Sequence, residues 1–158
     1  MSEVRVDVRV ENDIIIARQA GRNVAQKIGF GTADQTRLAT AISELTRNVV
    51  QYAQQGICVI RDDSDAQMLR IRVEVEDNGP GIPDVDRAMK DGYSTGRSLG
   101  MGLPGTRRIV QDFAIKSRPG NTKVAIAIAR PRAAVQPPTG ARPVARPAPA
   151  VRPWNTGR

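Results

Sequence analysis

The sequence feature that most constrains the fold is a stripe of apolar side chains between residues 38 and 52, spaced at intervals of three and four. This spacing places the side chains on one face of an α-helix, which has about 3.6 residues per turn. Thr32 is a residue type that caps helix N-termini, and Gly56 is expected to end the segment. We therefore predict one long amphipathic helix. Its apolar face consists of Leu38, Ala41, Ile42, Leu45, Val49 and Tyr52.

Patterns of period two surround this helix and predict strands. The valines at positions 4, 6, 8 and 10 alternate with polar residues, and the same alternation returns between residues 69 and 76. A further helix is expected from Asp13 to Ile28, and Gly29 is expected to end it. A short helix is expected near residues 85–91, and another from Pro104 to about residue 112. The remaining predicted strands are residues 57–61, 113–117 and 122–129.

The acidic segment 62–65 connects two of these strands. Asp and Ser are frequent in turns because their side chains bond to nearby backbone. We interpret the segment as a solvated hairpin turn rather than a metal site. Residues 118–121, Arg-Pro-Gly-Asn, are expected to form a second hairpin turn.

Charge divides the chain into two parts. Six of its 24 Lys and Arg residues lie from position 130 onward, where there is no acid, which leaves 18 basic and 16 acidic residues before that point. The early part is nearly neutral, so we do not expect a nucleic-acid-binding domain. After residue 130 the chain is Pro, Ala, Arg and Val without periodicity, and Trp154 is its one aromatic residue. We predict a folded domain over residues 1–130 and a disordered tail over 131–158 that acts as a linker or docking arm.

The chain contains no histidine, which excludes Ser-His-Asp catalysis, the usual zinc sites and a phosphohistidine relay within this chain. Cys58 is the single cysteine, so no internal disulfide can form, and its apolar neighbours predict that it is buried. The sequence shows no leader pattern and no apolar run near the ~18–20 residues that span a bilayer. We expect a cytoplasmic protein that does not enter membranes.

Glu44 and Asn48 are polar residues within the long helix, four positions apart and beside its apolar face. Four residues make about one turn, so both side chains point the same way. An amide oxygen is a suitable ligand for Mg²⁺, and a carboxylate can take a proton from a nucleophile. The alternative is that both side chains simply face solvent.

Residues 77–83, Asp-Asn-Gly-Pro-Gly-Ile-Pro, directly follow the alternating strand. Asp77 can accept a hydrogen bond from an exocyclic amine such as that of adenine. Gly79 and Gly81 allow the backbone to turn sharply and to approach a flat ring or a phosphate. An ordinary Asp-Asn-Gly-Pro turn is the alternative interpretation.

A third segment, residues 94–105, is rich in glycine and leads into a predicted helix. A glycine loop before a helix N-terminus presents free N–H groups and a favourable dipole to an anion, and Arg97 is a candidate contact to a terminal phosphate. Residues 100–105 formally match G-x-G-x-x-G. A dinucleotide-binding unit is not expected, because the segment does not follow the first strand and Asp112 comes too soon for the acidic partner.

The order of these segments resembles the GHKL ATPase superfamily, in which an E-x-x-x-N helix, a D-x-G-x-G box and a glycine-rich lid enclose ATP. Residues 41–48, 76–82, 91–95 and 99–105 are most similar to its switch-kinase branch, the serine/threonine kinases that work with the bacterial stressosome. The resemblance extends over nearly all of residues 4–129.

The resemblance implies a two-layer α+β fold, with a mixed sheet of four or five strands and helices on one face. It implies that Glu44 is the general base, Asn48 the magnesium ligand and Asp77 the residue that reads adenine, with Gly79 and Gly81 shaping that pocket. The lid residues implied to contact the ATP phosphates are Gly100, Met101, Gly102, Leu103 and Gly105.

The resemblance also implies the partners. The phosphate acceptor would be a serine or threonine of a STAS-domain antagonist or scaffold protein, and the kinase would also regulate a downstream output protein such as a PP2C-like phosphatase. An anti-sigma factor that acts mainly by sequestering its partner is the alternative. Because Glu44 and Asn48 are both present, we favour the kinase. A histidine kinase would need a phosphoacceptor histidine, which this chain lacks.

Overall fold

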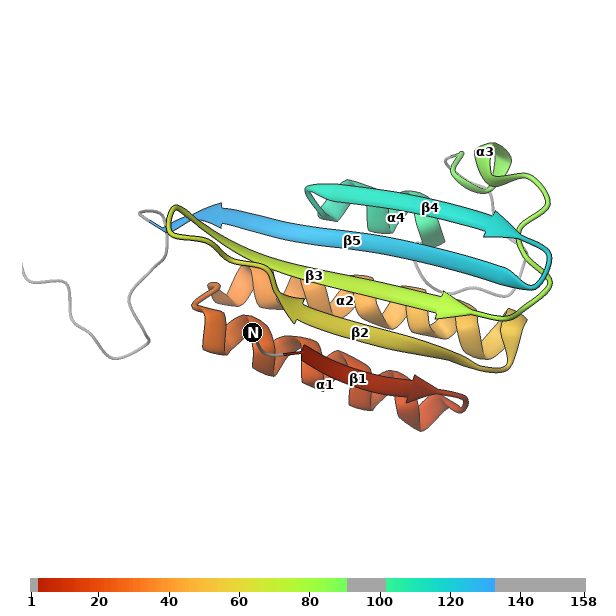
Figure 1. Cartoon of the computed structure of the whole chain (residues 1–158), viewed down its shortest axis with the longest axis horizontal. Helices are drawn as coiled ribbons and strands as arrows, with labels where there is room; N and C mark the ends of the chain where they lie inside the picture. The colour runs from red at the N-terminus through yellow and green to blue at the C-terminus, as the bar shows by residue number, and fades with distance from the viewer. Residues whose placement is uncertain (1–2, 91–101, 133–158) are drawn as a thin grey trace, which may run out of the picture.

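The protein is described by a computed structural model that covers residues 3–90 and 102–132 (Figure 1). Over these residues, five strands form one sheet in the order β1-β2-β3-β5-β4. Arg97, Gly100, Met101 and the predicted tail after residue 132 lie outside the described residues. The strands are β1 (Glu3–Val8), β2 (Gly56–Asp62), β3 (Met68–Asp77), β4 (Asp112–Arg118) and β5 (Asn121–Pro131).

The helices α1 (Glu11–Ile28), α2 (Thr32–Asn48) and α4 (Gly102–Ile109) lie on one face of this sheet, while the short α3 (Val85–Ala88) lies beside one end of it (Figure 1). The predicted two-layer α+β fold is confirmed. α1 ends at the predicted stop, Gly29, whose φ of 113° is left-handed. Its first residue is Glu11 rather than Asp13, because the Asp13 carboxylate accepts backbone hydrogen bonds from Arg9 and Val10 and thereby caps the first turn.

The expectation of a mixed sheet was wrong, because every pair of neighbouring strands is antiparallel. Two helices, α1 and α2, connect β1 to β2, so the chain reverses direction three times and β2 starts opposite the end of β1, with Gly56 facing Val8. β4 runs in the same direction as β3, but β5 lies between them. No parallel pair is therefore formed among these strands.

The period-two pattern of the strands places their apolar side chains against the helices. In β3 every second residue, from Leu69 to Val75, is buried, as predicted. Cys58 in β2 is fully buried, also as predicted, and burial raises the pKa of its thiol to about 12. Val10 departs from the pattern, because β1 ends at Val8 and Val10 precedes α1 with 57% of its surface exposed.

The long helix changes its geometry near its end. α2 ends at Asn48 and continues as a π-helical turn over Val49–Ala53, which closes with a hydrogen bond from the Gln54 N–H to the Val49 carbonyl. A π turn contains more residues than an α turn, so later side chains are rotated relative to the apolar stripe. Tyr52 is consequently 48% exposed, and its predicted place on the buried face was wrong. The N-cap is Gly31 rather than Thr32, which is the first residue of the helix.

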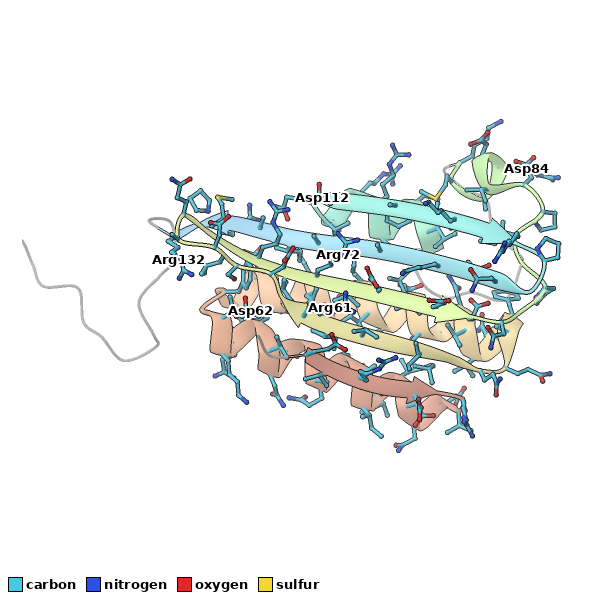
Figure 2. The ribbon with its side chains drawn as sticks, in the orientation of Figure 1. Arg61, Asp62, Arg72, Asp84, Asp112 and Arg132 are labelled. Carbon is cyan, nitrogen blue, oxygen red and sulfur yellow. The ribbon has the colours of Figure 1, made fainter. Side chains whose placement is uncertain are left out.

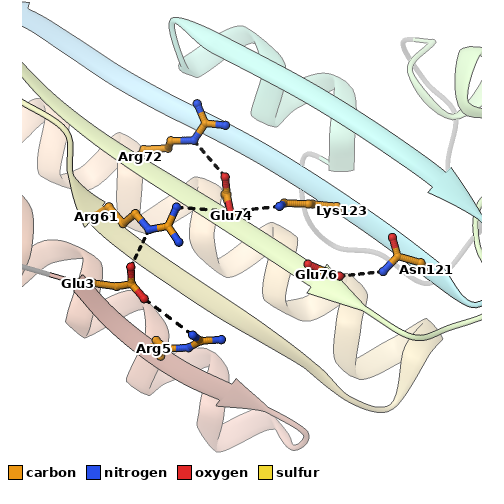
Figure 3. A network of polar contacts seen from close by, with 8 residues as sticks. All are labelled: Glu3, Arg5, Arg61, Arg72, Glu74, Glu76, Asn121 and Lys123. Carbon is orange, nitrogen blue, oxygen red and sulfur yellow. Dashed lines mark hydrogen bonds and ion pairs between the residues drawn. The ribbon is translucent and has the colours of Figure 1, made fainter.

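No helix or strand of residues 3–90 and 102–132 covers the other face of the sheet, which carries charged side chains, among them Arg61 and Arg72 (Figure 2). Glu74 lies at the centre of a network, 3.1 Å from Arg72 and 3.3 Å from Lys123, and these contacts help to lower its pKa against the opposing effect of burial (Figure 3). Alternating cations and anions across neighbouring strands stabilise antiparallel pairing modestly. The network is typical of a solvated sheet face.

The end of β5 is attached to two distant parts of the fold. The Arg130 guanidinium donates two hydrogen bonds, of 2.8 and 2.9 Å, to the buried Asp34 carboxylate at the start of α2. Arg132 donates a 2.8 Å hydrogen bond to the carbonyl of Asp65 in the turn between β2 and β3. That acidic segment forms the predicted hairpin turn, with the Asp63 N–H bonded to the Arg70 carbonyl.

Candidate active site

The Glu44 carboxylate is buried where α2 faces the start of α4. Its side chain is 8% exposed, so the interpretation that it simply faces solvent was wrong. One carboxylate oxygen, Oε1, accepts a 2.7 Å hydrogen bond from Arg47 Nη1, and the other, Oε2, lies 3.4 Å from the backbone nitrogen of Gly102. Because a helix N-terminus carries a partial positive charge, the start of α4 is a favourable neighbour for this carboxylate.

Asn48 lies one helical turn after Glu44, at the last residue of α2, and is half-buried. The π-helical turn begins at the next residue. π turns inside α-helices occur frequently at functional sites. The structure therefore places the predicted carboxylate and amide on one side of α2, at a change in helix geometry.

Asp77 ends β3 and is half-buried at the head of the D-x-G-x-G segment. Its Oδ1 accepts a 2.9 Å hydrogen bond from the Gly79 N–H. Loss of solvent raises the pKa of this carboxyl, assisted by the neighbouring charge of Glu76 and opposed by the Gly79 hydrogen bond. A half-buried carboxylate with lone pairs left to accept hydrogen bonds suits recognition of an amine.

The two glycines of this segment lie where a side chain would collide with other parts of the fold. A Cβ atom at Gly79 would lie 2.7 Å from the Cβ of Ala53, in the π-helical turn that follows Asn48. Gly81 has a φ of +84°, and a Cβ there would lie 2.5 Å from the carbonyl oxygen of Arg118. The segment after Asp77 is thus packed closely against the π-helical turn at Gly79 and against the end of β4 at Gly81.

Sequence reasoning missed Thr122, which lies opposite Asp77, and Ser117, which contacts Thr122. Thr122, which is 7% exposed, is the β5 residue opposite Asp77 in the strand register. Its Oγ1 lies 2.6 Å from Oγ of Ser117, which also accepts a 2.7 Å hydrogen bond from the Ile82 N–H. Pairing the predicted strand 122–129 with residues 69–77 would have placed Thr122 opposite Asp77. The residues next to Thr122 in the sequence give no such indication.

The described part of the glycine-rich segment is helical. α4 begins at Gly102, two residues before the predicted start at Pro104, because proline is tolerated within the first turn, where its missing N–H has no partner within the helix. It ends at Ile109 rather than near Asp112, which belongs to β4. Leu103 and Gly105 are both buried in this first turn. The Leu103 side chain packs in the core, which leaves its backbone as the part available to a ligand.

The structure thus connects three separate parts of the chain. The contact between Glu44 and Gly102 connects α2 to the glycine-rich segment. The close approach of Gly79 to Ala53 connects the segment that begins at Asp77 to the π-helical turn after α2. A carboxylate and an amide oxygen are ligand types that fit Mg²⁺.

Comparisons with known proteins agree with this arrangement. Residues 33–132 match the family model of histidine kinase-, DNA gyrase B-, and HSP90-like ATPases. The serine/threonine-protein kinase RsbT of Bacillus subtilis (strain 168) is 48% identical over 115 residues, which cover 73% of this chain and 86% of RsbT. Over the described residues, no helix is long and apolar enough to cross a membrane.

A solved structure shows the same fold. The RsbU and RsbW domains of a Mycobacterium tuberculosis protein superpose with a TM-score of 0.58 at 19% identity over 83% of this chain. This chain spans 33% of that larger protein, and a likeness at this identity concerns the fold alone. Together, the family match over residues 33–132 and the 48% identity to RsbT place this chain in the family of histidine kinase-, DNA gyrase B- and HSP90-like ATPases, in the branch that includes RsbT.

Proposed function

We propose that this protein is a cytoplasmic serine/threonine protein kinase that transfers the γ-phosphate of ATP to a STAS-domain antagonist or scaffold protein. We further propose that it regulates a downstream output protein such as a PP2C-like phosphatase. The observation that carries the proposal is the buried Glu44 carboxylate, one turn from Asn48 and 3.4 Å from the first backbone nitrogen of α4. The 48% identity to a serine/threonine-protein kinase supports the same reaction class.

In the proposed reaction, Glu44 takes the proton from a serine or threonine hydroxyl of the partner. The hydroxyl oxygen then forms a bond to the γ-phosphorus, and the bond between that phosphorus and the bridging oxygen of ADP breaks. Asn48 is the proposed Mg²⁺ ligand. When bound, the metal ion neutralises charge on the phosphates. Most of the remaining rate gain comes from positioning, since phosphoryl transfer needs little covalent chemistry from the protein.

Asp77 is proposed to accept a hydrogen bond from the exocyclic amine of adenine, with Gly79 and Gly81 forming the adjoining wall. Gly102, Leu103 and Gly105 are proposed to present backbone groups to the phosphates from the first turn of α4. Gly100, Met101 and Arg97, which lie outside the described residues, complete the proposed phosphate contacts.

The proposal is tested by incubating the full chain with γ-labelled ATP, Mg²⁺ and the STAS-domain protein encoded nearest to it in the genome. We expect label on a serine or threonine of the STAS protein, and we expect this label to be lost when Glu44 is replaced by Gln. A stable complex with a sigma factor, without any transfer of label, would instead identify a protein that acts by sequestration.

A further inference from the structure

Arg47 is a partly exposed residue that forms an ion pair with the buried Glu44 carboxylate. It lies three residues after Glu44 on α2, and its Nη1 donates a 2.7 Å hydrogen bond to Glu44 Oε1. The Arg47 side chain remains 37% exposed, whereas that of Glu44 is 8% exposed. Arg47 is therefore the more exposed partner of a buried carboxylate.

The two contacts that the described residues make to the Glu44 carboxylate differ in strength. The Arg47 bond is short and joins opposite charges, and such bonds are roughly twice as strong as neutral ones. The contact to the Gly102 nitrogen, at 3.4 Å, is long for a hydrogen bond. Among the described residues, the carboxylate without Arg47 would retain only this weak contact, so within this part of the chain its orientation depends mainly on the arginine.

We propose that Arg47 is a positioning residue for phosphoryl transfer, which acts through Glu44 by holding its carboxylate toward the start of α4. The inference rests on the proposed function of Glu44 as the base. A catalytic group that is misplaced by about 1 Å can lose on the order of 100-fold in rate. Arg47 is not among the residues proposed to bind adenine or phosphate. Its loss is therefore expected to lower kcat while ATP affinity is retained.

The test compares Arg47→Ala and Arg47→Lys with Arg37→Ala in the full chain. Arg37 is a matched control, because it makes an ion pair of the same i,i+3 spacing on the same helix, 2.8 Å from Asp34, and is 46% exposed. The measurements are kcat and KM with ATP and the STAS-domain partner, the Kd for a fluorescent ATP analogue, and the thermal midpoint. Arg47→Ala is also assayed with added guanidinium ion.

We expect kcat of Arg47→Ala to fall by about 10-fold or more, with the Kd for the analogue within about threefold of the wild-type value. Arg47→Lys is expected to be intermediate, since a lysine supplies the charge but not the planar fork. Guanidinium ion should restore part of the activity of Arg47→Ala and leave Arg37→Ala unaffected. If Arg47→Ala does not fold, the intermediate kcat of Arg47→Lys with unchanged nucleotide affinity serves as the supporting result.

An unchanged kcat in Arg47→Ala would overturn the positioning role and leave the kinase proposal intact. The same conclusion would follow if kcat fell only in proportion to the loss of thermal stability and guanidinium ion did not restore it. A wild-type protein that neither labels the partner nor releases phosphate from ATP would contradict the proposed function itself, and the role of Arg47 with it. The two failures are therefore distinguishable.

Discussion

Glu44 Oε2 and the backbone nitrogen of Gly102 lie 3.4 Å apart, although 58 positions separate the two residues in the sequence. This contact brings the middle of the long helix to the first turn of the helix that follows the glycine-rich segment. It explains how two motifs far apart in the chain contribute to one site.

Replacing Glu44 by Gln should remove phosphoryl transfer without removing ATP binding. Glutamine has nearly the same shape and can still accept the Gly102 N–H, but it cannot take a proton. General-base catalysis typically contributes about 10²–10⁴-fold, so we expect transfer to fall by at least about 100-fold. Labelled transfer and nucleotide calorimetry check this. Equal rates in the variant and the wild type would show that Glu44 is not the base.

Replacing Asp77 by Asn should weaken nucleotide binding without destabilising the fold. Because the pKa of Asp77 is raised by burial, ionising this carboxyl costs stability at neutral pH. The asparagine removes that cost and still accepts the Gly79 N–H. We expect ATP affinity to fall by about 10-fold or more, as for loss of a charged hydrogen bond. Undiminished affinity by calorimetry would remove Asp77 from the adenine contact.

The pH dependence of ATP binding should follow the ionisation of the Asp77 carboxyl group. Its raised pKa means that, on acidification, the carboxylate is lost at a higher pH than the ordinary value of 3.8. As the pH is lowered, the ATP affinity of the wild type should therefore begin to fall while the pH is still above 3.8. The ATP affinity of Asp77→Asn should not show the decrease that comes from protonation of this carboxylate. Titrations between about pH 7 and pH 4 compare the two. Identical profiles would contradict the assignment.

Replacing Gly81 by Ala should destabilise the protein more than replacing Gly120 by Ala. The two glycines have nearly the same φ, +84° and +86°, so both alanines suffer similar backbone strain of about 1–2 kcal/mol. A Cβ at Gly81 would also collide with the Arg118 carbonyl, whereas nothing lies within 4 Å at Gly120. Urea unfolding should show the larger loss for Gly81→Ala. Equal losses would mean that the Gly81 loop shifts freely.

The Asp34–Arg130 pair should make stability depend on acid pH. The Arg130 hydrogen bond lowers the pKa of Asp34 in the folded state below its ordinary value of 3.8. The resulting stabilisation is present above that pH and is lost as the pH falls through the lowered value. Because Arg130 is 38% exposed and partly screened by water, we expect Arg130→Met to cost about 1–2 kcal/mol at pH 7. A similar cost at a pH below the lowered pKa of Asp34 would contradict this account.

A chain that ends after Arg132 should fold and retain catalysis, whereas one that ends after Ala129 should be less stable. The shorter chain lacks the Arg130 contact to Asp34 and the Arg132 contact to Asp65. Thermal unfolding and labelled transfer compare both chains with the full protein. Loss of transfer in the chain that ends after Arg132 would show that the basic tail takes part in the chemistry.

Much of the fold could be predicted because periodicity reports burial directly. The alternation from Leu69 to Val75 and the stripe from Leu38 to Val49 identified the faces that pack together. The antiparallel sheet could not be read in this way, since strand order depends on how connections pass across the sheet. The π-helical turn that exposes Tyr52 leaves no signature in the apolar spacing.

The candidate site was predictable where the chemistry is local. Glu44, Asn48 and Asp77 were identified from spacing and residue type. The burial of Glu44 was not, because it results from α4 packing over α2 from a distant part of the chain. Arg47 and Thr122 were missed for a related reason. Neither a surface arginine nor a strand threonine is distinctive in the sequence, and it is the fold that pairs Arg47 with Glu44 and places Thr122 opposite Asp77.

A crystal structure of the full chain with Mg²⁺ and a non-hydrolysable ATP analogue tests the central claim most directly. We expect the adenine amine within hydrogen-bond distance of Asp77 and Mg²⁺ about 2.1 Å from the Asn48 amide oxygen, with the γ-phosphate between Glu44 and the start of α4. A nucleotide bound away from these residues, or none bound at a concentration that saturates the protein in solution, would contradict it.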